Sequence, residues 1–124
     1  MSKERYERGW DKLKEIDGEA GENVIESLKE IAPDLGKYVI EFAFGDIYSR
    51  DTLSLKQRQL VTIASLTTQG GCEPQLEVHI NAALNVGLTQ NEIVEAIIHC
   101  IPYVGFPRVL NGVNVAKKVF ANHK

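Results

Sequence analysis

The sequence predicts a small all-α protein of about seven helices, and three observations support that prediction. Apolar residues recur at spacings of three and four through most of the 124 residues, which is the period of an amphipathic helix. Strict alternation of apolar and polar residues, the pattern of a half-buried strand, is nearly absent. Glycine and proline separate the periodic segments, where helices usually end and begin.

Three helices are predicted in the first half of the chain. They cover residues 3–16, residues 20–31 and the stretch from Pro33 to Gly45, and residues 46–54 follow as a loop. Gly18 breaks the first helix from the second, and Pro33 suits a first helical turn because its missing amide proton would have no partner there. We expect the third helix to bury Leu35, Val39, Ile40 and Phe42.

Four helices are predicted in the second half. They run from Ser54 to Gly70 and over about residues 73–86, 90–101 and 107–122. The sequence Thr89-Gln90-Asn91-Glu92 is a capping box, in which the threonine oxygen and the glutamate each bond a backbone amide at the start of the helix. The length fits one domain, residues 1–124. Residues 1–30 form an N-terminal helical arm in this scheme.

Composition excludes several classes of protein. A formal charge of -3 with scattered Lys and Arg leaves no basic patch for nucleic acid. The start of the chain lacks the apolar core of a signal peptide, and no apolar run reaches membrane-spanning length. We therefore expect a cytoplasmic protein without a membrane partner. In that reducing compartment Cys72 and Cys100 would remain thiols.

Cys72, Gln75 and His79 share one helical stripe, since seven residues turn a helix through about 700°. The rise of about 1.5 Å per residue separates Cys72 from His79 by about 10 Å, so Gln75 is the nearer neighbour of the histidine. Direct proton transfer between Cys72 and His79 is therefore not expected unless the backbone bends at Pro74.

Several short motifs lie between about residues 30 and 120. They are Ala32-Pro33-Asp34-Leu35, Phe42-x-Phe44-Gly45-Asp46-x-x-Ser49-Arg50, Leu55-Lys56-x-Arg58-x-Leu60, Gly71, His79, Ala82-Ala83-Leu84-Asn85, Gly87-Leu88-Thr89, His99, Tyr103, Gly105-Phe106-Pro107 and Asn111. Together they resemble the carboxymuconolactone decarboxylase family, and the run Gly105-Phe106-Pro107 is the most specific. The resemblance implies an all-helical fold that forms a homo-oligomer, commonly a hexamer, with sites at subunit contacts.

The resembled family divides into cofactor-free decarboxylases and alkylhydroperoxidase D-like enzymes, which carry Cys-x-x-Cys followed by a histidine. Cys72 and His79 occupy the first cysteine and the histidine, but Gln75 replaces the second cysteine. An amide cannot resolve an oxidised sulfur. Gln59 stands where the peroxidase branch usually has glutamate, so a carboxylate of its proton relay is also missing. Both departures favour the decarboxylase branch.

In that branch the substrate is a butenolide with two carboxylates, and the product is an enol-lactone of aromatic-compound catabolism. The carbanion left by carbon dioxide spreads into the lactone carbonyl, so no cofactor is required. The protein must supply a general acid and cations. His79 is the candidate acid, because imidazole exchanges protons near neutral pH; the competing interpretation is a structural histidine in the core or an interface.

Other side chains complete the predicted site. Arg58 and Arg50, and after them Arg108, are candidates for clamping carboxylates with two parallel bonds, although surface arginines are more often solvated. Tyr103 and Phe106 are candidates for lining the pocket or for core packing. Gln75 would contact the substrate, and His99 is either a second site residue or a core histidine. No metal-ligand spacing connects the histidines and cysteines.

Two alternatives remain open. One is a thiol-dependent hydroperoxide reductase, a peroxiredoxin-like activity in which Cys72 is resolved by an external thiol; a buried, inert thiol is the expected role of Cys100. The other is an oligomeric binding protein that has lost the family chemistry, because a fold by itself does not imply a function.

Overall fold

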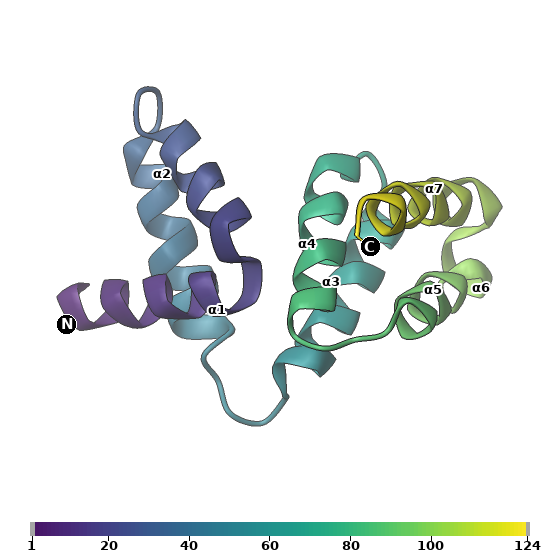
Figure 1. Ribbon diagram of the computed structural model, residues 1–124, viewed down its shortest axis with the longest axis horizontal. Helices are drawn as coiled ribbons and strands as arrows, with labels where there is room; N and C mark the ends of the chain where they lie inside the picture. The colour runs from purple at the N-terminus through teal and green to yellow at the C-terminus, as the bar shows by residue number, and fades with distance from the viewer. Residues whose placement is uncertain (1, 124) are drawn as a thin grey trace. The chain divides into compact units, whose positions relative to one another are not determined.

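Figure 1 shows a computed structural model of the protein, which describes residues 2–123. Side chains are described from Glu4 to His123. The elements are α1 (Ser2–Leu28), α2 (Pro33–Tyr38), the π-helix η1 (Val39–Ile47), α3 (Leu55–Gln69), α4 (Glu73–Asn85), α5 (Gln90–Ile98), α6 (Ile101–Val104) and α7 (Phe106–Asn122). No strand occurs in this part of the chain, which confirms the all-α prediction. The chain forms two compact units, residues 1–55 and 56–124.

In the first unit, the break predicted at Gly18 is present. Gly18 has φ 59° and ψ -142°, so α1 bends there into two limbs. The helix from Pro33 continues past Gly45 to Ile47, and its second part is π-helical. The predicted burial of Leu35 and Phe42 is wrong, since they are 50% and 58% exposed. The face that packs inward instead carries Gly36, Ile40 and Phe44, at spacings of four.

The first limb of α1 packs closely on η1 through glycines. A Cβ on Gly9 would overlap the carbonyl oxygen of Ile40, and a Cβ on Gly45 would lie 2.8 Å from the carbonyl oxygen of Arg5. Residues 1–30 therefore belong to a unit that extends to residue 55 and includes α2 and η1.

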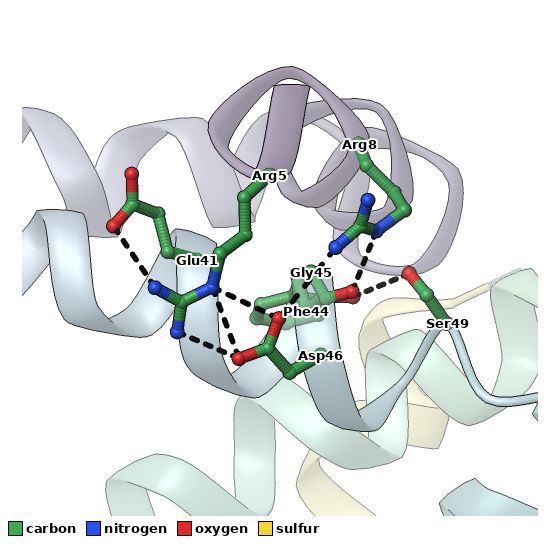
Figure 2. A network of polar contacts seen from close by, with 7 residues as sticks. All are labelled: Arg5, Arg8, Glu41, Phe44, Gly45, Asp46 and Ser49. Atoms are coloured by element: carbon green, nitrogen blue, oxygen red, sulfur yellow. Dashed lines mark hydrogen bonds and ion pairs between the residues drawn. The ribbon is translucent and has the colours of Figure 1, made fainter. Parts of the chain in front are cut away.

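Charged side chains also connect α1 to η1, near the C-terminal end of η1 where the two helices cross (Figure 2). Arg5 donates to both carboxylate oxygens of Asp46, with Nε at 2.9 and 3.0 Å and a terminal nitrogen at 2.6 Å. Its other terminal nitrogen lies 3.7 Å from the buried Glu41. Arg8 Nε donates to the carbonyl oxygen of Gly45 at 2.9 Å, which satisfies a carbonyl that the helix end leaves unpaired.

The second unit is built around one apolar core to which α3, α4, α5 and α7 all contribute. Its buried members are Ile63, Leu76, Ile80, Ala83, Leu88, Ile93, Ile97, Cys100, Val109, Ala116 and Val119. Gly112 lets α7 approach closely, because a Cβ there would lie 3.1 Å from Ile97 and 3.3 Å from Thr67.

The capping box at Thr89 is present as predicted. The helix predicted to run to residue 101 ends instead at Ile98, and α6 follows as a separate short turn that stops at Gly105, whose φ is 86°. None of the helices in residues 2–123 combines the length and apolar character needed to cross a bilayer.

Candidate active site

The centre of the candidate site is a contact between α3 and α4. His79 Nδ1 lies 3.2 Å from Gln59 Oε1. Gln59 is fully buried, on the face of α3 that also carries Ile63 and Thr67. The core face of α4 carries the buried residues Leu76, Ile80 and Ala83, which lie about one turn apart. His79 directly precedes Ile80 on this helix and is half-buried, so it lies at the border of the core face.

The environment of His79 keeps its imidazole neutral at physiological pH. Burial lowers the pKa of His79 to about 4, because the charged form loses hydration in the protein interior. Gln59 contributes a neutral amide rather than a carboxylate, so this contact adds no negative charge that would favour the imidazolium.

Cys72 lies at a different point, in the turn that leads into α4. Gly70 and Gly71 both have φ 71°, a conformation that favours glycine, and Cys72 follows as the N-cap residue. Its thiol lies 2.7 Å from Gln69 Oε1 and 3.4 Å from the carbonyl oxygen of Gly70. Thus Cys72 and His79 hydrogen-bond to different glutamines, and the predicted separation of the two residues agrees with this.

Arg108 is brought to the same turn from α7. A Cβ on Gly70 would lie 2.6 Å from Arg108 Nε, so the arginine side chain covers this glycine. The sequence placed Arg108 behind Arg58 and Arg50. The structure locates it as a cation beside the segment that carries Cys72.

The remaining predicted arginines differ in their positions. Arg58 is half-buried and directly precedes Gln59 on α3. Arg50 is exposed and belongs to the first unit. Its place in a site with His79 stays a prediction.

Gln75, Tyr103 and Phe106 are exposed, and the two aromatic residues are 75% and 65% accessible. Core packing, one of the two roles considered for these aromatics, is therefore wrong, and their role in a pocket stays a prediction. His99 is also exposed, with its ring 5.9 Å from that of Tyr103. The expectation of a core histidine at this position is wrong, because His99 follows the last residue of α5 on its outer side.

Cys100 is buried in the core, with its Sγ 3.5 Å from the carbonyl oxygen of Ala96. Both cysteines are free thiols. The predicted burial of Cys100 is confirmed, whereas the reactivity of Cys72 stays a prediction.

A surface groove of about 460 Å³ lies between α4 and α7. It is lined by Glu73, Pro74, Glu77, Asn111, Asn114, Val115 and Lys118. Glu77 and Lys118 form an ion pair of 2.9 Å across it. None of the predicted site residues lines this groove, so we do not assign the reaction to it.

Comparison with known proteins identifies the family of this chain. The model of the "Carboxymuconolactone decarboxylase family" matches residues 33–118. The chain belongs to the carboxymuconolactone decarboxylase family. The match includes the α3–α4 contact and the Cys72 turn, so the candidate site lies within the family domain.

Curated relatives agree with this family. The 4-carboxymuconolactone decarboxylase of Acinetobacter baylyi is 36% identical over 118 residues, which cover 94% of this chain and 87% of that protein. An uncharacterised 15.0 kDa protein of Paracoccus denitrificans is 32% identical over 77% of this chain and 72% of its own length. The nitrosuccinic acid decarboxylase of Metarhizium robertsii is 34% identical over 64% of this chain and 55% of its own length. Two of these three are named as decarboxylases, which supports a decarboxylase role for this family member.

Two glutamines of the candidate site are not predicted by the sequence. The family motifs show Gln59 only as the absence of a carboxylate, and they give no role to Gln69. A signal for Gln59 was present: it lies four residues before Ile63 in the apolar stripe of α3. A polar residue in such a stripe is buried and requires a partner. Gln69 gave no comparable signal, because its contact with Cys72 depends on the turn at Gly70.

Proposed function

We propose that this protein is a cofactor-free decarboxylase that converts a γ-carboxymuconolactone-type butenolide into an enol-lactone in aromatic-compound catabolism. The observation that carries the proposal is the half-buried His79, held by Gln59 within the matched family domain. Identity of 36% over nearly the whole chain to a 4-carboxymuconolactone decarboxylase supports the choice of substrate.

The chemistry of the substrate explains why the protein needs only to bind and protonate it. The bond between the ring carbon and one carboxylate breaks, carbon dioxide leaves, and the electron pair spreads through the ring double bond into the lactone carbonyl. Nitrosuccinic acid, named for another relative, similarly combines carboxylates with a group that accepts electrons. Both compounds provide their own electron sink, which supports decarboxylation of activated carboxylates as the common chemistry.

His79 is proposed as the acid that protonates the carbanion. The reaction consumes one proton: the carboxylate and a proton become a carbon–hydrogen bond and carbon dioxide. In the free protein, burial keeps His79 neutral, but a substrate with two negative charges would raise the pKa of His79. Substrate binding would therefore favour protonation of His79 before it must donate a proton to the carbanion.

Cationic side chains must hold the substrate carboxylates, and Arg58 is the first candidate in the second unit. It is half-buried and lies next to Gln59 on α3. Arg108, beside Gly70, is the second. A guanidinium that pairs with a carboxylate through two bonds provides both charge and orientation.

Carbon dioxide release from carboxymuconolactone by the purified protein tests the proposal. We expect His79→Ala to reduce the rate by at least about 100-fold, whereas Cys72→Ser should retain it. Circular dichroism of both variants would establish that they fold. A wild type that does not turn over the compound contradicts the proposal, and loss of thiol-dependent peroxide consumption in Cys72→Ser would support the reductase alternative.

We further propose that the protein acts as a homo-oligomer, with a hexamer as the expected form. Tyr103, Phe106 and Leu110 leave large apolar side chains exposed around the start of α7, and exposed apolar clusters often mark interaction surfaces. Sedimentation of the purified protein tests this proposal, which a monomer at micromolar concentration would contradict.

A further inference from the structure

Gln59 is an unusual residue to find in the core. Its side chain is fully buried beside Ile63, where an amide loses its hydrogen bonds to water and requires protein partners in their place. Its oxygen has His79 Nδ1 at 3.2 Å. Its Nε2 has no hydrogen-bond partner among residues 4–123. The hydrogen bond that the structure gives this amide is thus directed at one nitrogen of one histidine.

The direction of this hydrogen bond determines the protonation of the ring. An amide oxygen accepts a hydrogen bond and cannot donate one. Where Gln59 Oε1 faces His79 Nδ1, the imidazole must carry its proton on Nδ1 for the bond to exist. The neutral ring then holds its lone pair on Nε2.

We propose that Gln59 is a positioning residue, which holds His79 in the Nδ1–H tautomer and thereby makes Nε2 the atom that exchanges a proton with the substrate. This inference rests on the proposed decarboxylase function. It adds a residue that acts through His79 rather than on the substrate.

The proton balance explains why this tautomer suits the reaction. The imidazolium carries protons on both nitrogens. When Nε2 gives its proton to the carbanion carbon, the neutral ring that remains is the Nδ1–H tautomer, already bonded to Gln59. No exchange of protons within the ring and no rotation of the ring is required before the next proton arrives at Nε2.

An amide suits this role better than a carboxylate. A carboxylate at residue 59 would also accept the Nδ1 proton, but its negative charge would stabilise the imidazolium and retain the proton. The neutral amide orients the ring without that charge. Burial then keeps the pKa of His79 low, so a protonated His79 is a strong acid toward carbon.

Nitrogen NMR of the imidazole rings tests the tautomer without any substrate. The chain has three histidines, so His99→Gln and His123→Gln variants suffice for assignment. At pH 7.5 we expect His79 to be protonated on Nδ1 in the wild type. The near-isosteric Gln59→Leu should shift His79 toward the Nε2–H tautomer. Gln59→Glu should keep the proton on Nδ1 and should keep the ring doubly protonated up to a higher pH.

A matched control is available on the same helix face. Thr67 is also buried, and its hydroxyl has no hydrogen-bond partner among residues 4–123, so Thr67→Val alters a buried polar group without touching His79. We expect it to leave the tautomer unchanged. A wild-type His79 protonated on Nε2, or a tautomer that Gln59→Leu does not alter, overturns the inference.

Kinetics supply the second part of the test. If the proposed reaction occurs, Gln59→Leu should lower kcat by about 10- to 100-fold with little change in KM. Gln59→Glu should move the decline of kcat with pH to higher pH. An unchanged kcat in a folded Gln59→Leu overturns the positioning role. A wild type that releases no carbon dioxide overturns the proposed function instead, and the NMR result still decides the tautomer.

Discussion

Gly9 of α1 lies directly against the carbonyl oxygen of Ile40 in η1, with no room for a side chain between the two helices. The contact is between backbones, and Gly45 makes the reciprocal approach to the carbonyl oxygen of Arg5 at the same crossing. Beside this contact, the ion pair between Arg5 of α1 and Asp46 of η1 joins the two helices (Figure 2). This crossing defines the first unit.

We predict that Gly9→Ala destabilises the first unit by at least about 2 kcal/mol, because a methyl group would push α1 away from η1. Trp10 is the single tryptophan and lies next to the substituted residue, so its fluorescence during urea unfolding reports the change. Gly36→Ala is the control. A Cβ there would lie 3.6 Å from Ile25, an ordinary contact, and we expect its stability to stay within about 1 kcal/mol of wild type. Equal stability of the two variants would contradict the close contact.

The buried Asp17 should make stability fall as pH rises. Burial raises the pKa of Asp17 from 3.8 to about 6, and its Oδ1 has no hydrogen-bond partner among residues 4–123. Between these values the folded state binds the proton and the unfolded state has lost it, so each unit of pH costs about 1.4 kcal/mol up to a total of about 3 kcal/mol. The full stability is present below pH 3.8, and the loss is complete above pH 6.

Asp17→Asn removes this titration. We predict that its stability advantage over wild type grows by about 2 kcal/mol between pH 4.5 and pH 7.5. Urea unfolding at the two pH values measures it, and the opposite pH dependence expected from His79 cancels in the difference. Asp11→Asn, at an exposed residue of the same helix, is the control, and its stability difference from wild type should be the same at both pH values. A stability difference between Asp17→Asn and wild type that does not change with pH would contradict the raised pKa of Asp17.

The pH dependence of the proposed reaction should reflect the low pKa of free His79. Since kcat/KM reports the free enzyme, we predict a decline of about tenfold per pH unit above about 4. The decline of kcat should begin at higher pH, because the bound dianion stabilises the imidazolium. Steady-state rates between pH 5 and 8 test both, and His123→Gln, at an exposed residue after α7, should leave the profiles unchanged. A flat kcat/KM would exclude protonated His79 as the donor.

Thr89→Ala should remove one half of the capping box of α5. Thr89 Oγ1 accepts from the Glu92 amide at 3.1 Å, and the Thr89 amide donates to Glu92 Oε1 at 2.9 Å. We predict a loss of about 1 kcal/mol in the second unit. Thermal unfolding followed by circular dichroism measures it, and Thr89→Ser should retain most of the stability. If serine and alanine are equally destabilising, the hydroxyl bond is not the cause.

Local rules account for what could be predicted about the fold. Gly18, Pro33, the Gly70-Gly71 pair and the capping box mark helix ends through backbone conformation and hydrogen bonds within a few residues. These features act over short distances, so the sequence displays them directly. The π-helical part of η1 was not predicted, since its pattern of apolar residues differs little from that of an α-helix.

The candidate site divides in the same way. The sequence by itself determined the family, the helical class and His79 as the candidate acid, because motifs and periodicity lie along the chain. Only the tertiary structure decided that Gln59, twenty residues earlier, is the partner of His79, that Arg108 covers Gly70, and that His99 is exposed. Which side chains meet across two helices depends on how those helices pack, and packing is set by the whole core rather than by the spacing of residues within one helix.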